Sequence, residues 1–128
     1  MALTPEVTDA LDEIAKAFPR ATLTIHEDGH GGAMVIVEPV PLGGPYLQSS
    51  TWIGFHVTHL HPQADIYPHH VRGDLSRRDS AALGSGTSPS SFEGRPSIQL
   101  SRRSNRRDAA MDTALLKMQR VVSWLFAK

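Results

Sequence analysis

The stretch Trp52–Val71 constrains the fold most, because it predicts a strand and also the place where that strand stops. From Ile53 to His61 the side chains alternate between two sets, which is the period of a strand whose two faces differ. This alternation puts His59 and His61 on the same face as Ile53. Pro62 is predicted to end the strand, because proline cannot donate a hydrogen bond to a sheet. A chain with such a segment needs further strands beside it.

Two runs earlier in the chain are predicted to supply those strands. Ala21–His26 alternates and is rich in β-branched residues, and Ala33–Val40 is an apolar run of strand length. The glycine-rich residues 27–32 predict a turn, so the two runs predict a hairpin. Ser97–Leu100 is a shorter candidate strand. Residues 80–94 are rich in glycine and serine, and we expect them to form a flexible loop.

Amphipathic helices are predicted at both ends of the chain. Thr4 and Pro5 mark the start of the first helix and Pro19 its end, while Asp108 is predicted to cap the second. The apolar stripes that follow the helical period are Val7, Leu11, Ile14 and Phe18 in the first helix, and Met111, Leu115, Met118, Val122 and Leu125 in the second. The order of elements predicts one α+β domain over residues 1–128, an antiparallel strand meander packed against an N-terminal and a C-terminal helix.

The chain contains no cysteine among its 128 residues, which excludes disulfides, thiolate ligands and thioester chemistry on this chain. The net charge is zero, but residues 1–70 carry −6 and residues 71–128 carry +6. Such asymmetry is typical of an electrostatic binding face, unless the two halves fold together and mix their charges. The sequence has neither a secretory signal nor an apolar run of about 18 residues. We therefore expect a cytoplasmic protein with no membrane segment and no cofactor.

Two segments carry a family resemblance. His61–Val71, HPQADIYPHHV, is similar to the P-x-x-Y-P-x-x-P-x-V region of the ubiquitin-conjugating enzymes. Ile98–Asn105, together with the helix predicted over 112–124, resembles divergent bacterial members of that superfamily, which also contains the RWD domains. A first helix, a strand meander and a Tyr-Pro turn follow the plan of the same fold. The resemblance implies a ubiquitin-conjugating-enzyme-like fold over most of the chain.

The resemblance also implies a function, because this chain lacks the cysteine that carries the modifier in the family enzymes. The position nearest to that cysteine is Gln99, and glutamine is a poor nucleophile. The resemblance thus implies a non-catalytic protein that acts by protein–protein interaction in a bacterial ubiquitin-like modification or defence system. Its implied partners are a ubiquitin-like modifier or an activating-enzyme-like protein. The predicted contact residues are Tyr67, Pro68, His69, His70, Gln99, Arg102, Arg103, Arg106 and Arg107.

The histidines allow a second interpretation, in which three of them lie together and bind zinc, as three-histidine sites do. The candidate ligands are His59, His61 and His69, supported by Asp65 or Asp74. One of these histidines could instead act as general base for a serine. The spacing matches no specific zinc motif. The alternative is a buried, hydrogen-bonded His59 and an exposed His69-His70 pair in the turn.

The arginines near the C-terminus allow a third interpretation. Guanidinium groups suit phosphate or carboxylate, so the cluster predicts a non-specific nucleic-acid site. Its members are Arg102, Arg103, Arg106 and Arg107, with Arg77 and Arg78. Two features oppose it, namely the absence of interleaved aromatic residues for base stacking and the zero net charge. The alternatives are a solvated face and a contact with an acidic protein partner.

Overall fold

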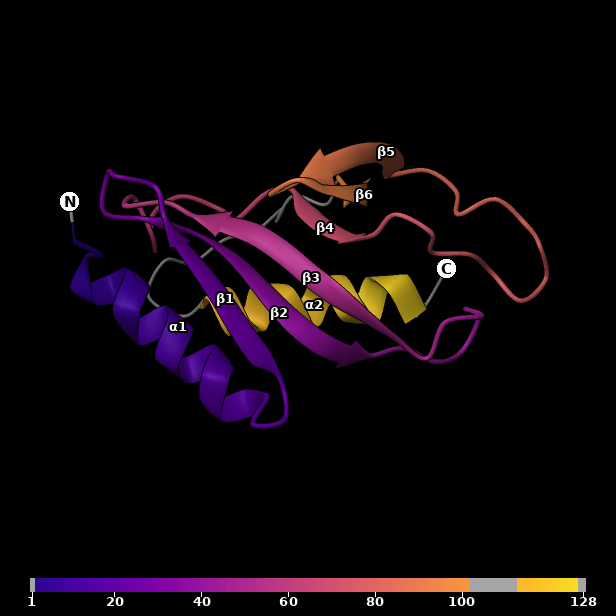
Figure 1. Ribbon diagram of the computed structural model, residues 1–128, viewed down its shortest axis with the longest axis horizontal. Helices are drawn as coiled ribbons and strands as arrows, with labels where there is room; N and C mark the ends of the chain where they lie inside the picture. The colour runs from indigo at the N-terminus through magenta and orange to yellow at the C-terminus, as the bar shows by residue number, and fades with distance from the viewer. Residues whose placement is uncertain (1, 102–112, 127–128) are drawn as a thin grey trace.

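The computed structural model describes residues 2–101 and 113–126 (Figure 1). Its elements are α1 (Pro5–Ala17), β1 (Thr22–Glu27), β2 (Ala33–Pro41), β3 (Ser50–Val57), β4 (His69–Arg72), β5 (Thr87–Phe92), β6 (Arg95–Leu100) and α2 (Ala114–Phe126). The strands form one antiparallel sheet in the order β1-β2-β3-β4-β6-β5. The predicted α+β class, with a strand meander between two helices, is confirmed.

One hydrophobic core lies between the sheet and the two helices. Alternate residues of β3 point into it, and Ile53, Phe55 and Val57 are fully buried there. The helices add Val7, Ala10, Leu11 and Ile14 from α1, and Ala114, Met118, Val121 and Leu125 from α2. Figure 1 shows α2 crossing behind the central strands. The apolar stripes predicted from the helical period therefore face the core wherever the structure describes them.

The start of α1 follows the sequence signals. The Oγ1 atom of Thr4 accepts a hydrogen bond from the backbone N–H of Val7 at 3.2 Å, and Pro5 occupies the first position of the helix. This arrangement satisfies one of the backbone donors that a helix leaves without an internal partner. The cap predicted for the second helix, Asp108, lies outside the described residues, as does Met111.

Strand β3 stops at Val57, four residues before the predicted end. Thr58 begins a turn instead: its carbonyl accepts from the backbone N–H of His61 at 3.0 Å, and its hydroxyl accepts from that of Leu60 at 3.3 Å. These bonds replace those of the sheet. The prediction that His59 and His61 share a strand face is therefore wrong, and the two side chains differ, with His59 exposed and His61 buried.

The second half of the predicted flexible loop over 80–94 is a strand, so that part of the prediction is wrong. β5 pairs with β6 along its whole length, and Glu93 and Gly94 make the hairpin turn with φ values of 50° and 77°. The turn favours glycine at the second of these positions. Most β5 side chains are exposed serines or Pro89, so the strand buries too little apolar surface to show a sequence period.

The two oppositely charged halves of the chain meet in ion pairs. Arg95 donates to Glu38 at 3.0 Å, and Lys117 donates to Asp65 at 3.2 Å. Each pair joins a basic residue of the second half to an acidic residue of the first. The charge asymmetry along the sequence is therefore reduced by folding at these points.

The sheet face that carries Trp52, Gly54 and His70, here called the open face, is turned away from the core. The hairpin β5–β6 curls over part of it. The ring of Phe92, at the end of β5, lies 4.9 Å from that of His70 and 6.4 Å from that of Trp52, measured between centroids. Gly54 gives Phe92 the room to do so, because it has no side chain on this face.

Gly54→Ala is expected to lower the free energy of unfolding by about 2 kcal/mol, because a new methyl group overfills a packed site. A Cβ atom there would lie 2.6 and 2.7 Å from carbons of the Phe92 ring and 3.0 Å from Trp52. Urea denaturation followed by circular dichroism measures the change. Gly43→Ala is the matched control, because a Cβ atom at Gly43 has nothing within 4 Å. Equal stability of the two variants would contradict the packing described for Phe92.

Candidate functional site

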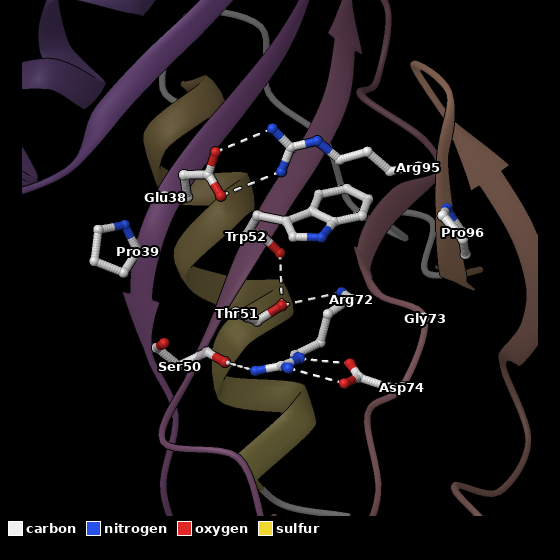
Figure 2. Close-up of a pocket in the computed structure, with 10 residues that line it drawn as sticks. All are labelled: Glu38, Pro39, Ser50, Thr51, Trp52, Arg72, Gly73, Asp74, Arg95 and Pro96. Atoms are coloured by element: carbon white, nitrogen blue, oxygen red, sulfur yellow. Dashed lines mark hydrogen bonds and ion pairs between the residues drawn. The ribbon is translucent and has the colours of Figure 1, made fainter.

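A pocket of about 550 Å³ lies on the open face, between the ends of β2 and β3 on one side and β4 and β6 on the other. We call it the Trp52 pocket (Figure 2). Its lining residues are Glu38, Pro39, Ser50, Thr51, Trp52, Arg72, Gly73, Asp74, Arg95 and Pro96. Its lining residues come from strands that are separated in the sequence, so the pocket exists only in the folded sheet.

A bidentate ion pair crosses one end of the pocket. The Nη1 and Nη2 atoms of Arg95 donate to the two carboxylate oxygens of Glu38 at 3.1 and 3.0 Å. The same guanidinium lies 5.4 Å from the centroid of the Trp52 ring, within the range of a cation–π contact. The hydrogen bonds that Arg95 donates to Glu38 raise the pKa of the guanidinium. Glu38, Trp52 and Arg95 thus hold one another in place, although they come from three strands.

A second bidentate pair lies on the other side of Trp52. Arg72 donates from Nε and Nη2 to the carboxylate of Asp74 at 2.5 and 2.9 Å, and from Nη1 to the carbonyl of Ser50 at 3.0 Å. The hydrogen bonds from Arg72 lower the pKa of Asp74. The backbone N–H of Arg72 also donates to the hydroxyl of Thr51 at 3.0 Å. These bonds fix the guanidinium at the rim of the pocket.

The Trp52 pocket combines an aromatic ring with two arginine–carboxylate pairs. Its titratable lining groups are two carboxylates and two guanidinium groups, and each carboxylate already accepts hydrogen bonds from one guanidinium. The Thr51 hydroxyl already donates to the carbonyl of Trp52 at 2.7 Å. Beside these charged groups the lining includes the Trp52 ring and two prolines. An aromatic and arginine-rich surface of this kind is suited to recognition.

His69 and His70 are buried, so the interpretation of this pair as exposed turn residues is wrong. His69 is 0% exposed, its ring lies 5.1 Å from that of Phe55, and neither ring nitrogen has a hydrogen-bond partner among the described residues. Burial lowers the pKa of His69 to about 3 and also lowers that of His70. Alternation explains the different surroundings, since His69 points into the core and His70 lies under Phe92.

His70 forms the kind of pair that a serine nucleophile needs. Its Nδ1 atom lies 3.0 Å from the hydroxyl oxygen of Ser97. Both residues are buried, with 7% and 3% of their surface exposed, and the ring of Phe92 covers His70. A substrate has no access to this hydroxyl in the structure, so the pair acts as a polar contact within the sheet.

The three proposed zinc ligands are not brought together as a site. Among residues 2–101 and 113–126, no group of three or more histidine, aspartate or glutamate residues is placed to hold a metal ion. The two predicted supporting carboxylates bind cations of the protein instead, Asp65 with Lys117 and Asp74 with Arg72. The early end of β3 is the reason, because it separates His59 from the buried histidines.

The other predicted contact residues are spread over several places. Tyr67 and Pro68 are partly exposed just before β4, and Gln99 lies in β6 opposite His70. Arg77 bonds to Asp79 at 3.1 Å, and Arg78 is exposed. The remaining four lie outside the described residues, namely Arg102, Arg103, Arg106 and Arg107. A role in binding stays a prediction for all of these residues.

Sequence reasoning missed the residues of the Trp52 pocket. Glu38 and Arg95 are 57 positions apart, and nothing in their local sequence links them. One signal was present: the alternation of β3 puts a large aromatic residue, Trp52, on the face opposite the core-facing Ile53. An aromatic residue on a face without a covering helix is a pointer to a binding surface.

Comparisons with protein families, with curated proteins and with solved structures find no match to this sequence. Within the described residues, neither helix has both the length and the apolar character needed to cross a membrane.

Proposed function

We propose that this chain is a non-catalytic protein-interaction module with a ubiquitin-conjugating-enzyme-like fold, which acts in a bacterial ubiquitin-like modification or defence system. The observation that carries the proposal is the Trp52 pocket, an open depression in which Trp52 lies between two arginines. Its partners would be a ubiquitin-like modifier or an activating-enzyme-like protein.

The residue types in the pocket support a protein partner. Tryptophan and arginine are enriched among the residues that dominate binding energy at protein interfaces. Here both guanidinium groups are partly exposed, with 34% of the Arg72 side chain and 36% of the Arg95 side chain accessible. Ion pairs already hold both in position, so little side-chain freedom is lost when a partner binds.

The order of elements and the composition support the remaining parts of the proposal. A helix precedes an antiparallel meander and a second helix closes the chain, which is the order that the family resemblance implies. A thioester requires a cysteine, and the sequence contains none. Gln99, the position nearest to the family cysteine, hydrogen bonds to the Ser101 hydroxyl at 3.4 Å. An amide in that place supports binding without catalysis.

Capture of partners by the wild-type chain and by Trp52→Ala tests the proposal. We expect affinity purification from the native host to recover a ubiquitin-like or activating-enzyme-like protein, and Trp52→Ala to reduce the recovery at least about tenfold, as for a central interface residue. Quantitative mass spectrometry measures the recovery. Leu60→Ala is the control, because Leu60 is 54% exposed and does not line the pocket.

Arg72→Ala provides a second variant in case the loss of Trp52 disturbs the hairpin β5–β6. Circular dichroism would establish that each variant is folded before capture. Unchanged recovery with both folded variants would refute the pocket as the contact surface. Recovery of neither class of protein by the wild-type chain would refute the proposed function itself.

A further inference from the structure

The groups left available in the Trp52 pocket are mainly hydrogen-bond donors. A guanidinium has five N–H donors. Toward the described residues, Arg95 uses two of them and Arg72 uses three. Each carboxylate oxygen of Glu38 and Asp74 already accepts from one of these guanidinium groups. An occupant that complements the pocket must therefore bring acceptors.

Trp52 adds a further donor and a large apolar surface. No described residue accepts a hydrogen bond from its indole N–H, and Figure 2 shows the nitrogen-bearing edge of the ring facing the side where Arg72 lies. Pro39 and Pro96 line the same pocket. The occupant should therefore combine an acceptor group with an apolar one.

The pair between Arg95 and Glu38 limits how an occupant can lie. In Figure 2 it spans from β2 to β6 and passes over Trp52, so it bounds the pocket at that end. A pocket of about 550 Å³ holds only a few residues of a peptide. A peptide that enters the pocket along Trp52 is therefore expected to have its end inside the pocket.

We infer that the Trp52 pocket binds the C-terminal end of a peptide, with the terminal carboxylate on Arg72 and an apolar last side chain against Trp52. A carboxylate matches the fork of a guanidinium, which is the pairing that Arg72 already makes with Asp74. The inference rests on the proposed function, because it names the part of the partner that enters the pocket.

Asp74 occupies the place that the terminal carboxylate would take. It follows Arg72 by two residues, and 65% of its side chain is exposed, so it can leave the guanidinium without disturbing the core. An incoming carboxylate would displace it and take over the two N–H donors. Removing the charge of Asp74 should therefore strengthen the binding of a peptide end.

The test uses N-acetyl-L-phenylalanine, which mimics a peptide end, and N-acetyl-L-phenylalanine amide, which lacks only the charge. Titration of the ¹⁵N-labelled protein is followed at the indole N–H signal of Trp52, assigned with Trp124→Phe. We expect saturable shifts with the acid and at least about fivefold weaker binding of the amide, as for loss of a charge-assisted bond. Equal binding of acid and amide would overturn the inference.

Variants locate the carboxylate on Arg72. Asp74→Asn should bind the acid about threefold more tightly or better, whereas Arg72→Ala should lose most of the affinity. Arg78→Ala is the matched control, because Arg78 is exposed and does not line the pocket. Tighter binding in the Asp74→Asn protein cannot arise from misfolding, so this variant keeps the test decisive. Unchanged affinity in Asp74→Asn would contradict the displacement.

Inorganic phosphate, used as a third probe, separates a peptide site from a general anion site. Phosphate that competes with the acid at equal concentration would overturn the inference in favour of an anion site. The proposed function fails separately, if the wild-type chain captures neither a ubiquitin-like nor an activating-enzyme-like protein. Capture that depends on Trp52, together with equal binding of acid and amide, would refute only the peptide-end inference.

Discussion

Asp65→Asn is expected to lower the free energy of unfolding by about 3 kcal/mol, because it leaves the charge of a buried lysine without its carboxylate. The side chain of Lys117 in α2 is only 6% exposed, and its Nζ atom lies 3.2 Å from an Asp65 carboxylate oxygen. An amide in place of the carboxylate keeps the shape but loses most of the attraction. Urea denaturation at pH 7 measures the change.

The double variant Asp65→Asn, Lys117→Met should regain most of the lost stability. Methionine has about the shape of the buried lysine stem and carries no charge, and replacing both members of a buried pair is often nearly neutral. Asp12→Asn, on the exposed side of α1, is the control for a lost surface carboxylate and should change stability by less than about 0.5 kcal/mol. A double variant no more stable than Asp65→Asn would show that the pair is not the cause.

Acidification is expected to unfold the protein partly through His69. Burial holds the pKa of this imidazole at about 3 in the folded protein, against 6.5 when it is free. Between these values the unfolded chain binds a proton that the folded protein excludes. The free energy of unfolding therefore falls as the pH falls from about 6.5 toward 3, by up to about 5 kcal/mol for this group.

The groups around His69 act in both directions. The positive charge of Lys117 lowers the pKa of His69 further, His70 acts the same way, and the carboxylate of Asp65 raises it. Desolvation is the largest cause, so the imidazole stays neutral in the core at pH 7.

His69→Leu isolates this contribution to the pH dependence. Its free energy of unfolding should fall less than that of the wild-type protein between pH 6.5 and 4, because leucine takes up no proton. Urea denaturation across this range gives the difference between the two proteins. His59→Ala is the control for the loss of a histidine side chain, because His59 is exposed. Parallel curves for His69→Leu and wild type would rule out His69 as a source of acid instability.

The helices were predictable because each one buries a single face. In α1, Val7, Leu11 and Ile14 repeat at the helical period and are buried as that period requires. The same holds for Met118 and Leu125 in α2. The apolar period of a helix that packs against a sheet shows which of its residues are buried. Such a helix can therefore be predicted without knowing the distant residues that it contacts.

β5 and the buried histidines were not predictable by the same reasoning. β5 is held in the sheet by hydrogen bonds to β6. Its serines and Pro89 do not form a pattern of alternating apolar residues. The end of β3 depends on the turn that Thr58 forms, in which turn hydrogen bonds replace those of the sheet. The alternation of side chains does not show which of the two sets of hydrogen bonds will form. An error of four residues at that point was enough to place His59 in a false cluster.

The candidate site was unpredictable for a different reason. Its central parts, Glu38, Trp52, Arg72 and Arg95, belong to four strands whose neighbours are fixed only once the sheet has formed. The family resemblance pointed instead to Tyr67 and Gln99, which lie outside the pocket. Strand order, and not local sequence, decides which side chains converge on the open face.

The hairpin β5–β6 is connected by side-chain pairs to the strands at the opposite side of the sheet. Beyond the bridge to Glu38, the turn residue Glu93 reaches His26 of β1, with 2.9 Å between the carboxylate oxygen and Nδ1. The outermost strand at one side is thereby tied to a hairpin that forms the other side. The pairs Glu93–His26 and Arg95–Glu38 therefore connect the hairpin to β1 and β2.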